Sequence, residues 1–352
     1  MQPVGLYIHV PFCKRKCAYC DFFSAAAKNT EEYVRAVIRN IKAAGRKYDT
    51  VYFGGGTPSL LKAGQIADIL DAADISEGAE ISMECNPDSA DFNYLCGLHS
   101  AGVNRISFGV QSLDNAELAA LGRLHDADKA IEAILSAEKA GFGNVSADIM
   151  LATPMQTAES LSRTIDTLLK LPLTHISAYL LKVEKDTPLS LDSALLEKVP
   201  DEDSTADMYL MTAEKLSAAG FEQYEISNFA RKGFECRHNL KYWRCEEYFG
   251  VGPSAHSFLD GKRFFCPTDT EKFISQPLQE RVFLSRGGDP EEKAMLALRL
   301  TKEGLSLAEF PEAEKRAEPL LKSGLVKKEQ GALMLTAEGC LVSNEIICRL
   351  IG

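Results

Sequence analysis

The segment Leu6-Tyr-Ile-His-Val-Pro-Phe-Cys13-Lys-Arg-Lys-Cys17-Ala-Tyr-Cys20 places three cysteines directly after a short apolar run. Three thiolates spaced C-x3-C-x2-C can ligate one cube-shaped iron–sulfur cluster from a single loop. Three ligands for four irons leave one iron open to an amino and a carboxylate group of a small molecule. Zinc is the alternative, but zinc sites prefer four ligands, commonly in two separated pairs, and no second pair lies nearby. The spacing therefore predicts a [4Fe–4S] cluster on Cys13, Cys17 and Cys20.

Downstream of this loop, short apolar segments alternate with longer amphipathic ones. The pattern predicts strands at 6–10, 50–53, 80–84, 105–110, 144–150 and 175–180, and helices at 31–44, 63–73, 91–101, 127–140 and 158–169. Thr30 is the expected N-cap of the first helix, and Gly45 follows its end. Strands that alternate with helices form parallel βαβ units. We therefore predict an α/β fold, a partial (β/α)6 barrel over residues 1–230.

Polar residues stand where several of these strands end. Gly54-Gly-Gly-Thr-Pro-Ser59 follows the second strand, and Glu84, Gln111 and Asp148 close the third, fourth and fifth. Arg123 lies in a later loop. Glycines let the backbone face a ligand, a carboxylate suits ribose hydroxyls, and an arginine pairs with a carboxylate. Each residue alone is more often a surface or capping residue, but in barrels of this kind the strand ends carry the chemistry.

The cysteine spacing after the first strand, with an aromatic residue before the third cysteine, resembles the radical S-adenosylmethionine (SAM) superfamily. The resemblance implies a cluster with SAM bound at its open iron, and reductive cleavage of SAM to a 5′-deoxyadenosyl radical. The coproporphyrinogen oxidase-like branch is the most similar. By that resemblance the SAM site is lined by Tyr7, Tyr19, Gly55, Gly56, Thr57, Glu84, Gln111, Arg123 and Asp148. His9 and Phe12 would lie beside the cluster, although His9 could equally be a core histidine.

Two kinds of protein in this branch differ at features visible here. The oxygen-independent coproporphyrinogen III oxidases have a fourth cysteine two residues after the third, where this chain has Phe22, and an N-terminal extension before the cluster. The HemW heme chaperones carry an H-N-x-x-Y-W motif, which matches His238-Asn-Leu-Lys-Tyr-Trp243. A neutral imidazole is a suitable axial ligand for heme iron, and aromatic faces suit a porphyrin. From residue chemistry alone, a capping role for His238 and a core role for Trp243 are the more common outcome.

Cations near this motif are candidates for the heme propionates, namely Lys241, Arg237 and Arg231. The match to the branch continues through Gly250-Val-Gly-Pro-Ser-Ala-His256-Ser-Phe258. Ser254 stands where the family has glycine. Ala152-Thr-Pro-Met-Gln-Thr157 replaces the family's Gly-Leu-Pro-Gly-Gln-Thr. These departures leave the cluster motif intact and bear on the backbone of a loop near the SAM pocket.

The rest of the chain predicts two smaller units. Residues 231–287 form a β-rich extension that carries the H-N-x-x-Y-W motif, and 287–290 read as a linker. Residues 288–352 predict helices at 290–300, 306–323 and 337–350 with a hairpin at 325–336, turning at Gln330-Gly331. This arrangement resembles a winged-helix module. Such modules often bind DNA, but acidic residues slightly outnumber basic ones here, which weakens that interpretation.

Composition limits the partners. The formal net charge of −11 argues against a general nucleic-acid surface. No long apolar run predicts a membrane span or a signal peptide, so a cytoplasmic location is expected, with peripheral membrane association left open.

We expect a heme chaperone that captures heme through His238 and transfers it to acceptor proteins, with cluster and SAM gating transfer or supporting association. The alternative is an oxygen-independent coproporphyrinogen III oxidase, a SAM-dependent decarboxylase of heme biosynthesis. A winged-helix nucleic-acid regulator is the least favoured class.

Overall fold

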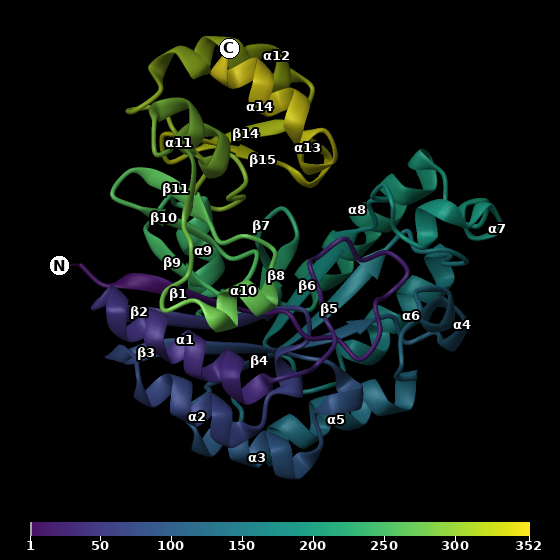
Figure 1. Ribbon diagram of the computed structural model, residues 1–352. Helices are drawn as coiled ribbons and strands as arrows, with labels where there is room; N and C mark the ends of the chain where they lie inside the picture. Colours follow the sequence, from purple (N-terminus) through teal and green to yellow (C-terminus); the bar gives the residue numbers. More distant parts are fainter. Residues whose placement is uncertain (1) are drawn as a thin grey trace.

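A computed structural model describes residues 2–352 (Figure 1). One twelve-stranded sheet runs through it in the order β12-β11-β10-β9-β1-β2-β3-β4-β5-β6-β8-β7. Six parallel strands form its centre: β1 (Val4–Val10), β2 (Lys47–Gly55), β3 (Asp74–Cys85), β4 (Arg105–Gln111), β5 (Val145–Leu151) and β6 (His175–Leu180). The predicted parallel α/β barrel architecture is therefore confirmed.

Helices alternate with these strands or follow them along the chain, and the lower half of Figure 1 shows several of them covering the outer face of the sheet. They are α1 (Thr30–Ala44), α2 (Ala63–Asp71), α3 (Phe92–Ser100), α4 (Asn115–Ala120), α5 (Ala127–Lys139), α6 (Ala158–Leu168), α7 (Ser193–Leu196) and α8 (Glu202–Ala218). In α1, Val34, Val37 and Ile41 recur at helical spacing and are buried. In β1, Leu6 and Ile8 are fully buried, so the two elements share one hydrophobic core.

The structure differs from the sequence-based expectation in several details. The N-cap of α1 is Asn29, in the left-handed conformation, and Thr30 is the first helical residue. Helices α4, α7 and α8 were not predicted. After β6 the sheet ends in two short antiparallel strands, β8 (Asn228–Ala230) and β7 (Glu222–Glu225).

The predicted β-rich extension continues the same sheet on the other side of β1. Strand β9 (Tyr248–Val251) pairs parallel with β1, and antiparallel strands follow it outward. These are β10 (His256–Leu259), β11 (Lys262–Phe265) and β12 (Val282–Arg286). Two helices belong to this segment, α9 (Arg237–Trp243) and α10 (Thr270–Ser275). Residues 231–287 therefore extend the barrel sheet rather than forming a separate layer.

The C-terminal module lies above the sheet in Figure 1. Its helices are α11 (Pro290–Ala297), α12 (Pro311–Lys322), α13 (Ala337–Leu341) and α14 (Ser343–Ile351), and its strands are β13 (Leu305–Ser306), β14 (Val326–Glu329) and β15 (Ala332–Leu335). The predicted hairpin turns at Gln330 and Gly331, both with positive φ, as a type I′ turn requires. The helix predicted at 337–350 is instead two helices that meet at Val342.

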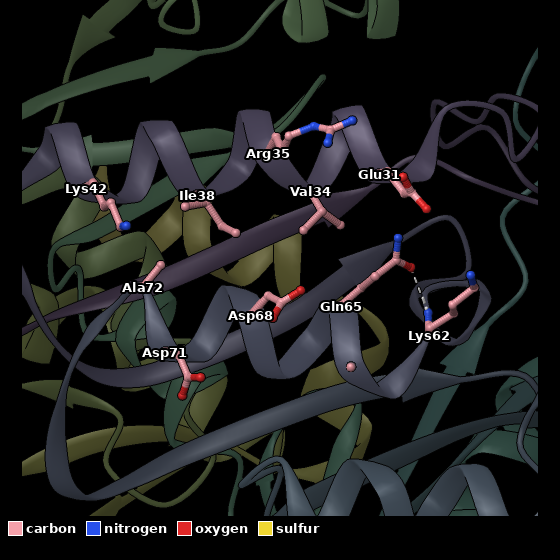
Figure 2. Close-up of a pocket in the computed structure, with 11 residues that line it drawn as sticks. Glu31, Val34, Arg35, Ile38, Lys42, Lys62, Gln65, Asp68, Asp71 and Ala72 are labelled. Carbon is pink, nitrogen blue, oxygen red and sulfur yellow. Dashed lines mark hydrogen bonds between the residues drawn. The ribbon is translucent and has the colours of Figure 1, made fainter.

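A groove of about 690 Å³ separates α1 from α2 on the outer helical face (Figure 2). Its charged side chains are mixed in sign: Glu31, Asp68 and Asp71 face it together with Arg35 and Lys42. None of the residues predicted for the cluster, SAM or heme lines this groove. The candidate functional site therefore lies elsewhere, on the inner side of the sheet.

Among residues 2–352, no helix combines the length and the apolar character needed to cross a membrane.

Candidate functional site

A cavity of about 420 Å³ lies at the carboxyl ends of the barrel strands. The predicted residues that line it are Cys13, Cys17, Tyr19, Cys20, Gly55, Gly56, Thr57, Glu84, Gln111, Arg123 and Asp148. They come from loops and strand ends far apart in the sequence. The carboxyl ends of parallel strands meet on one side of the sheet, which explains why they converge.

The loop that carries the three cysteines is fixed to the segment after α4. The backbone N–H of Ala18 donates to the carbonyl oxygen of Leu121 at 3.0 Å. The Arg15 guanidinium donates to the carbonyl oxygens of Gly122 and Arg123. These bonds hold the cysteine loop beside the arginine that lines the cavity.

Two of the cysteine sulfurs accept hydrogen bonds from cavity residues. The hydroxyl of Thr57 lies 3.6 Å from Cys13 Sγ, and Nη1 of Arg123 lies 3.4 Å from Cys17 Sγ. No three metal-ligating side chains among residues 2–352 are close enough together to hold a single ion. Thiolates that each bind a different iron of a cube must be spaced more widely than the ligands of one zinc ion. Three thiols that line one cavity are a donor set that suits a cluster.

The glycine loop after β2 presents bare backbone to the cavity. A Cβ atom on Gly56 would lie 2.7 Å from the carbonyl oxygen of Phe12. A Cβ atom on Gly55, where φ is 108°, would lie 2.7 Å from the His9 ring. No larger residue fits at either position, so the N–H and C=O groups of this loop can face a ligand.

Two acidic residues line the cavity floor and both are held toward the neutral form. Burial raises the pKa of Glu84 to about 7, and the nearby Asp148 adds to this rise. Burial also raises the pKa of Asp148, against hydrogen bonds from Ser177 and Ser107. Glu84 accepts a hydrogen bond from Tyr52 Oη at 2.8 Å. A ligand that donates hydrogen bonds to these carboxyls would favour their charged forms.

Arg123 reaches across the cavity from the other side. Its Nη2 donates to Asn86 Oδ1 at 2.7 Å and to the carbonyl oxygen of Gly109 at 2.8 Å. Its buried Nε has no hydrogen-bond partner among residues 2–352. An arginine that lines the cavity suits a ligand carboxylate.

The comparisons with known proteins agree with this site. The radical SAM superfamily matches residues 7–168. The chain is 36% identical over its full length to the heme chaperone HemW of Mycobacterium tuberculosis, of which it covers 95%. It is 34% identical over 98% of its length to the heme chaperone HemW of Bacillus subtilis, of which it covers 98%. The chain belongs to the HemW family of radical SAM proteins.

A solved structure shares the whole HemW-family fold described above. Coproporphyrinogen III oxidase (HemN) of Escherichia coli matches with a TM-score of 0.81 and 22% identity, over 99% of this chain and 90% of that one. At this level of identity the likeness concerns the fold alone.

Membership of this radical SAM family implies a [4Fe–4S] cluster and SAM, and the cavity fits both. Cys13, Cys17 and Cys20 would hold the cluster, while the glycine loop and Arg123 would meet the methionyl part of SAM. In the radical SAM superfamily, a bound cluster of this kind would supply an electron for the reductive cleavage of SAM. The chain itself supplies the thiols, the backbone groups and the side-chain donors that line this cavity.

Some residues predicted to line the SAM site or to lie beside the cluster are behind the cavity wall of this HemW-family chain. Tyr7 does not line the cavity; its hydroxyl lies 3.1 Å from Nδ1 of His9, and its ring stacks on Tyr52. His9 is buried beneath Gly55. Phe12 is a core residue that contacts Tyr33 edge to face. These residues support the loops from behind.

The predicted heme ligand, His238, lies on α9 and is fully buried. Its Nδ1 lies 2.8 Å from Thr50 Oγ1, and its Nε2 lies 2.8 Å from Tyr242 Oη. Burial lowers its pKa to about 3, so the ring is neutral. Both nitrogens have partners, so iron ligation by His238 stays a prediction that requires α9 to move.

The cations predicted for the heme propionates also have partners. Lys241 pairs with Asp49 at 2.9 Å and with Glu246 at 3.1 Å. Arg237 donates to the carbonyl oxygen of Gly78. Arg231 lies over the ring of Phe221. In this conformation the three do not converge on one ligand.

Sequence reasoning missed several residues that line the cavity, and Asn239 and Arg105 are two of them. Asn239, the second residue of the H-N-x-x-Y-W motif, faces the cavity, although His238 does not. Arg105 begins β4, lines the cavity floor and is buried, and its Nε lacks a partner within residues 2–352. For Arg105, the sequence signal was a basic residue at the start of an apolar strand. No signal indicated that Asn239 would face the SAM site.

The three departures from the family's glycines keep the glycine-like backbone. Ala152, Met155 and Ser254 have φ values of 58°, 70° and 68°. These lie in the left-handed region that disfavours residues with a Cβ atom. The loops near the SAM pocket therefore have the conformation that glycine would favour, at some cost in stability.

Proposed function

We propose that this chain is a heme chaperone that binds heme and transfers it to acceptor proteins. The observation that carries the proposal is its full-length similarity to proteins named heme chaperone HemW in several bacteria. The position of α9 supports it: one residue of the HemW motif, Asn239, lines the cavity where SAM would bind. A change in that cavity can thus reach the helix that carries His238.

Cys13, Cys17 and Cys20 hold the cluster in this proposal. The residues that would line the SAM site are those predicted from the sequence, except Tyr7. Tyr7 lies outside the cavity lining and stacks on Tyr52. His238 would ligate heme only after α9 has moved, because Thr50 and Tyr242 now take both ring nitrogens. Cluster and SAM would then gate that movement or support association with the acceptor.

The alternative is an oxygen-independent coproporphyrinogen III oxidase. Its support is the common fold with the E. coli oxidase. Against it stands Phe22 at the position of that enzyme's fourth cysteine. Phe22 is 62% exposed at the edge of the cavity, so an apolar surface rather than a thiol faces outward there.

We also propose the division into 1–230, 231–287 and 288–352, a cytoplasmic location and no nucleic-acid partner. The wing-like hairpin carries Lys327 and Lys328, but they pair with Glu329 and Glu314. That pairing leaves little free positive charge for phosphates.

The experiment is an anaerobic heme titration of cluster-reconstituted protein, with a coproporphyrinogen III turnover assay on the same sample. The chaperone proposal expects saturable, stoichiometric heme binding, transfer to an apoprotein and no decarboxylation. SAM-dependent release of carbon dioxide from the porphyrinogen would instead assign the chain to the oxidases.

A further inference from the structure

The chain has six histidines, and the structure separates them by what their ring nitrogens contact. Four are buried and engaged: His9, His125, His175 and His238. An imidazole must offer an accessible nitrogen lone pair to bind iron. Only His99 and His256 are exposed. These two are therefore the histidines that can offer an accessible nitrogen to heme iron.

His99 lies on α3, and its ring packs edge to face on Phe142 on the outer helical side of the barrel. His256 is the first residue of β10, in the part of the sheet beside β9 and β1 (Figure 1). Its ring has no hydrogen bond to any side chain or backbone group in residues 2–352. Its plane lies 27° from that of Phe265, with the ring centroids 6.0 Å apart.

The register places His256 in an apolar row. His256 pairs with Phe265 of β11, and Phe265 pairs with Val282 of β12. Residues directly opposite one another in antiparallel strands point to the same face. The row crosses three strands, about 10 Å in all at the usual spacing, which is comparable to a porphyrin's width. Phe265 and Val282 are only half-buried, so the row is open to a ligand.

The row belongs to the inner side of the sheet, where the cavity lies. Phe258 pairs with Tyr248, and Tyr248 pairs with Gly5. Since side chains alternate along a strand, His256 shares a face with Phe258, and Tyr7 with Gly5. His256 is close enough to His9, beneath the glycine loop, to contribute to lowering its pKa.

The surroundings favour the form of imidazole that binds iron. Burial against the sheet and the positive charge of Arg263 lower the pKa of His256. Arg263 also faces Tyr248 and the carboxylate of Glu292, which lies 2.7 Å from its Nε. A neutral ring with a free nitrogen is therefore the dominant state at neutral pH.

We propose that His256 supplies the axial imidazole for heme in this conformation, with the porphyrin against Phe265 and Val282. An axial imidazole is perpendicular to the porphyrin plane, so the edge of the nearly parallel Phe265 ring would meet the porphyrin face. This inference rests on the proposed heme-binding function and names its first binding site. His238 is then left for a later step that opens α9.

The test is a heme titration of the full, cluster-reconstituted chain, with resonance Raman and electron paramagnetic resonance spectra of the ferric complex. His256→Ala should remove the histidine-ligated signature and weaken heme binding by at least about tenfold. Added imidazole should restore the signature. His99→Ala, the other exposed imidazole, is the matched control and should behave as wild type. Because His256 is exposed, its variant should keep the wild-type iron and sulfide content.

The outcomes separate this inference from the proposed function. Wild-type protein that binds no heme would overturn the proposed function itself. Wild-type protein that binds heme through histidine, with an unchanged signature in His256→Ala, would overturn only the assignment of His256. Loss of the signature in His238→Ala alone would place the ligand on α9 instead.

Discussion

The hydroxyl of Tyr242 lies 2.8 Å from Nε2 of His238, one turn earlier in the same helix. With Thr50 at the other ring nitrogen, the imidazole is bonded on both sides and fully buried. Whichever tautomer is present, one partner donates and the other accepts. The motif histidine of this family is thus a structural link between α9 and β2 in the conformation described here.

Tyr242→Phe should weaken this link and free Nε2. A buried nitrogen left without a partner costs about 1–2 kcal/mol, which urea unfolding would measure. Tyr48→Phe is the matched control, because the buried hydroxyl of Tyr48 has no hydrogen-bond partner within residues 2–352. That control should be neutral or slightly stabilising. Equal losses in the two variants would contradict the link.

Glu80 fixes the start of α9 from β3. Its two carboxylate oxygens accept hydrogen bonds from the backbone N–H groups of Arg237 and His238, both at 3.0 Å. Glu80→Gln should cost about 1–2 kcal/mol, since a charged acceptor at a helix start is lost. Hydrogen exchange at the first α9 amides should accelerate. Glu77→Gln, exposed in the same strand, is the control and should leave both quantities unchanged.

Much of this site could be predicted because it depends on local patterns. The cysteine spacing and the polar residues at the strand ends are each local patterns in the sequence. These residues come together because the carboxyl ends of parallel strands meet on one side of the sheet. The partners of His238 could not be predicted in this way. Thr50 lies 188 positions away, and only the packing of α9 on β2 brings the two side chains together.

Arg105 was missed for a related reason. It stands at the start of β4, the end opposite to the carboxyl end. A long side chain can still reach the cavity floor from there. Burial opposes the charge of Arg105, but the neighbouring Cys236 and Glu80 raise its pKa and keep it charged. Helix boundaries such as the break at Val342 also escaped prediction, because an apolar stripe continues across them.

Replacing Ala152, Met155 and Ser254 with glycine should stabilise the protein. Each residue now has a positive φ, and glycine relieves a cost of roughly 0.5–1 kcal/mol per position. Thermal or urea unfolding of the three single variants would measure the gain. Lys185→Gly, in an exposed turn with ordinary φ, should lose stability through added chain entropy. Losses in all four variants would refute the backbone argument.

Cys17→Ala should abolish the cluster. The variant removes a ligand whose sulfur now accepts a hydrogen bond from Arg123. Iron and acid-labile sulfide should fall to background after anaerobic reconstitution, together with the charge-transfer absorbance. Cys96→Ala, a half-buried cysteine on α3, should retain the full content. Unchanged iron and sulfide in Cys17→Ala would exclude the cluster assignment.

The raised pKa of Glu84 makes a pH-dependent prediction for SAM. Because burial raises this pKa to about 7, the carboxyl gains its charge as the pH rises through that value. If the carboxylate accepts hydrogen bonds from SAM, affinity should strengthen between pH 6 and pH 8. Glu84→Gln should remove this pH dependence and weaken binding at pH 8 by about tenfold. Isothermal titration at several pH values would measure both effects.

The same shift has the opposite consequence for the stability of the SAM-free protein. The folded pKa of Glu84 lies above its unfolded value, so the folded state binds more protons between the two. The contribution of Glu84 to the free energy of unfolding is therefore fully present below about pH 4.5 and is lost as the pH rises through 7. Glu84→Gln should be more stable than wild type at pH 8, by about 3 kcal/mol, and the gain should vanish below about pH 4.5. A variant that lost stability equally at both pH values would show that the carboxyl serves the fold rather than the ligand.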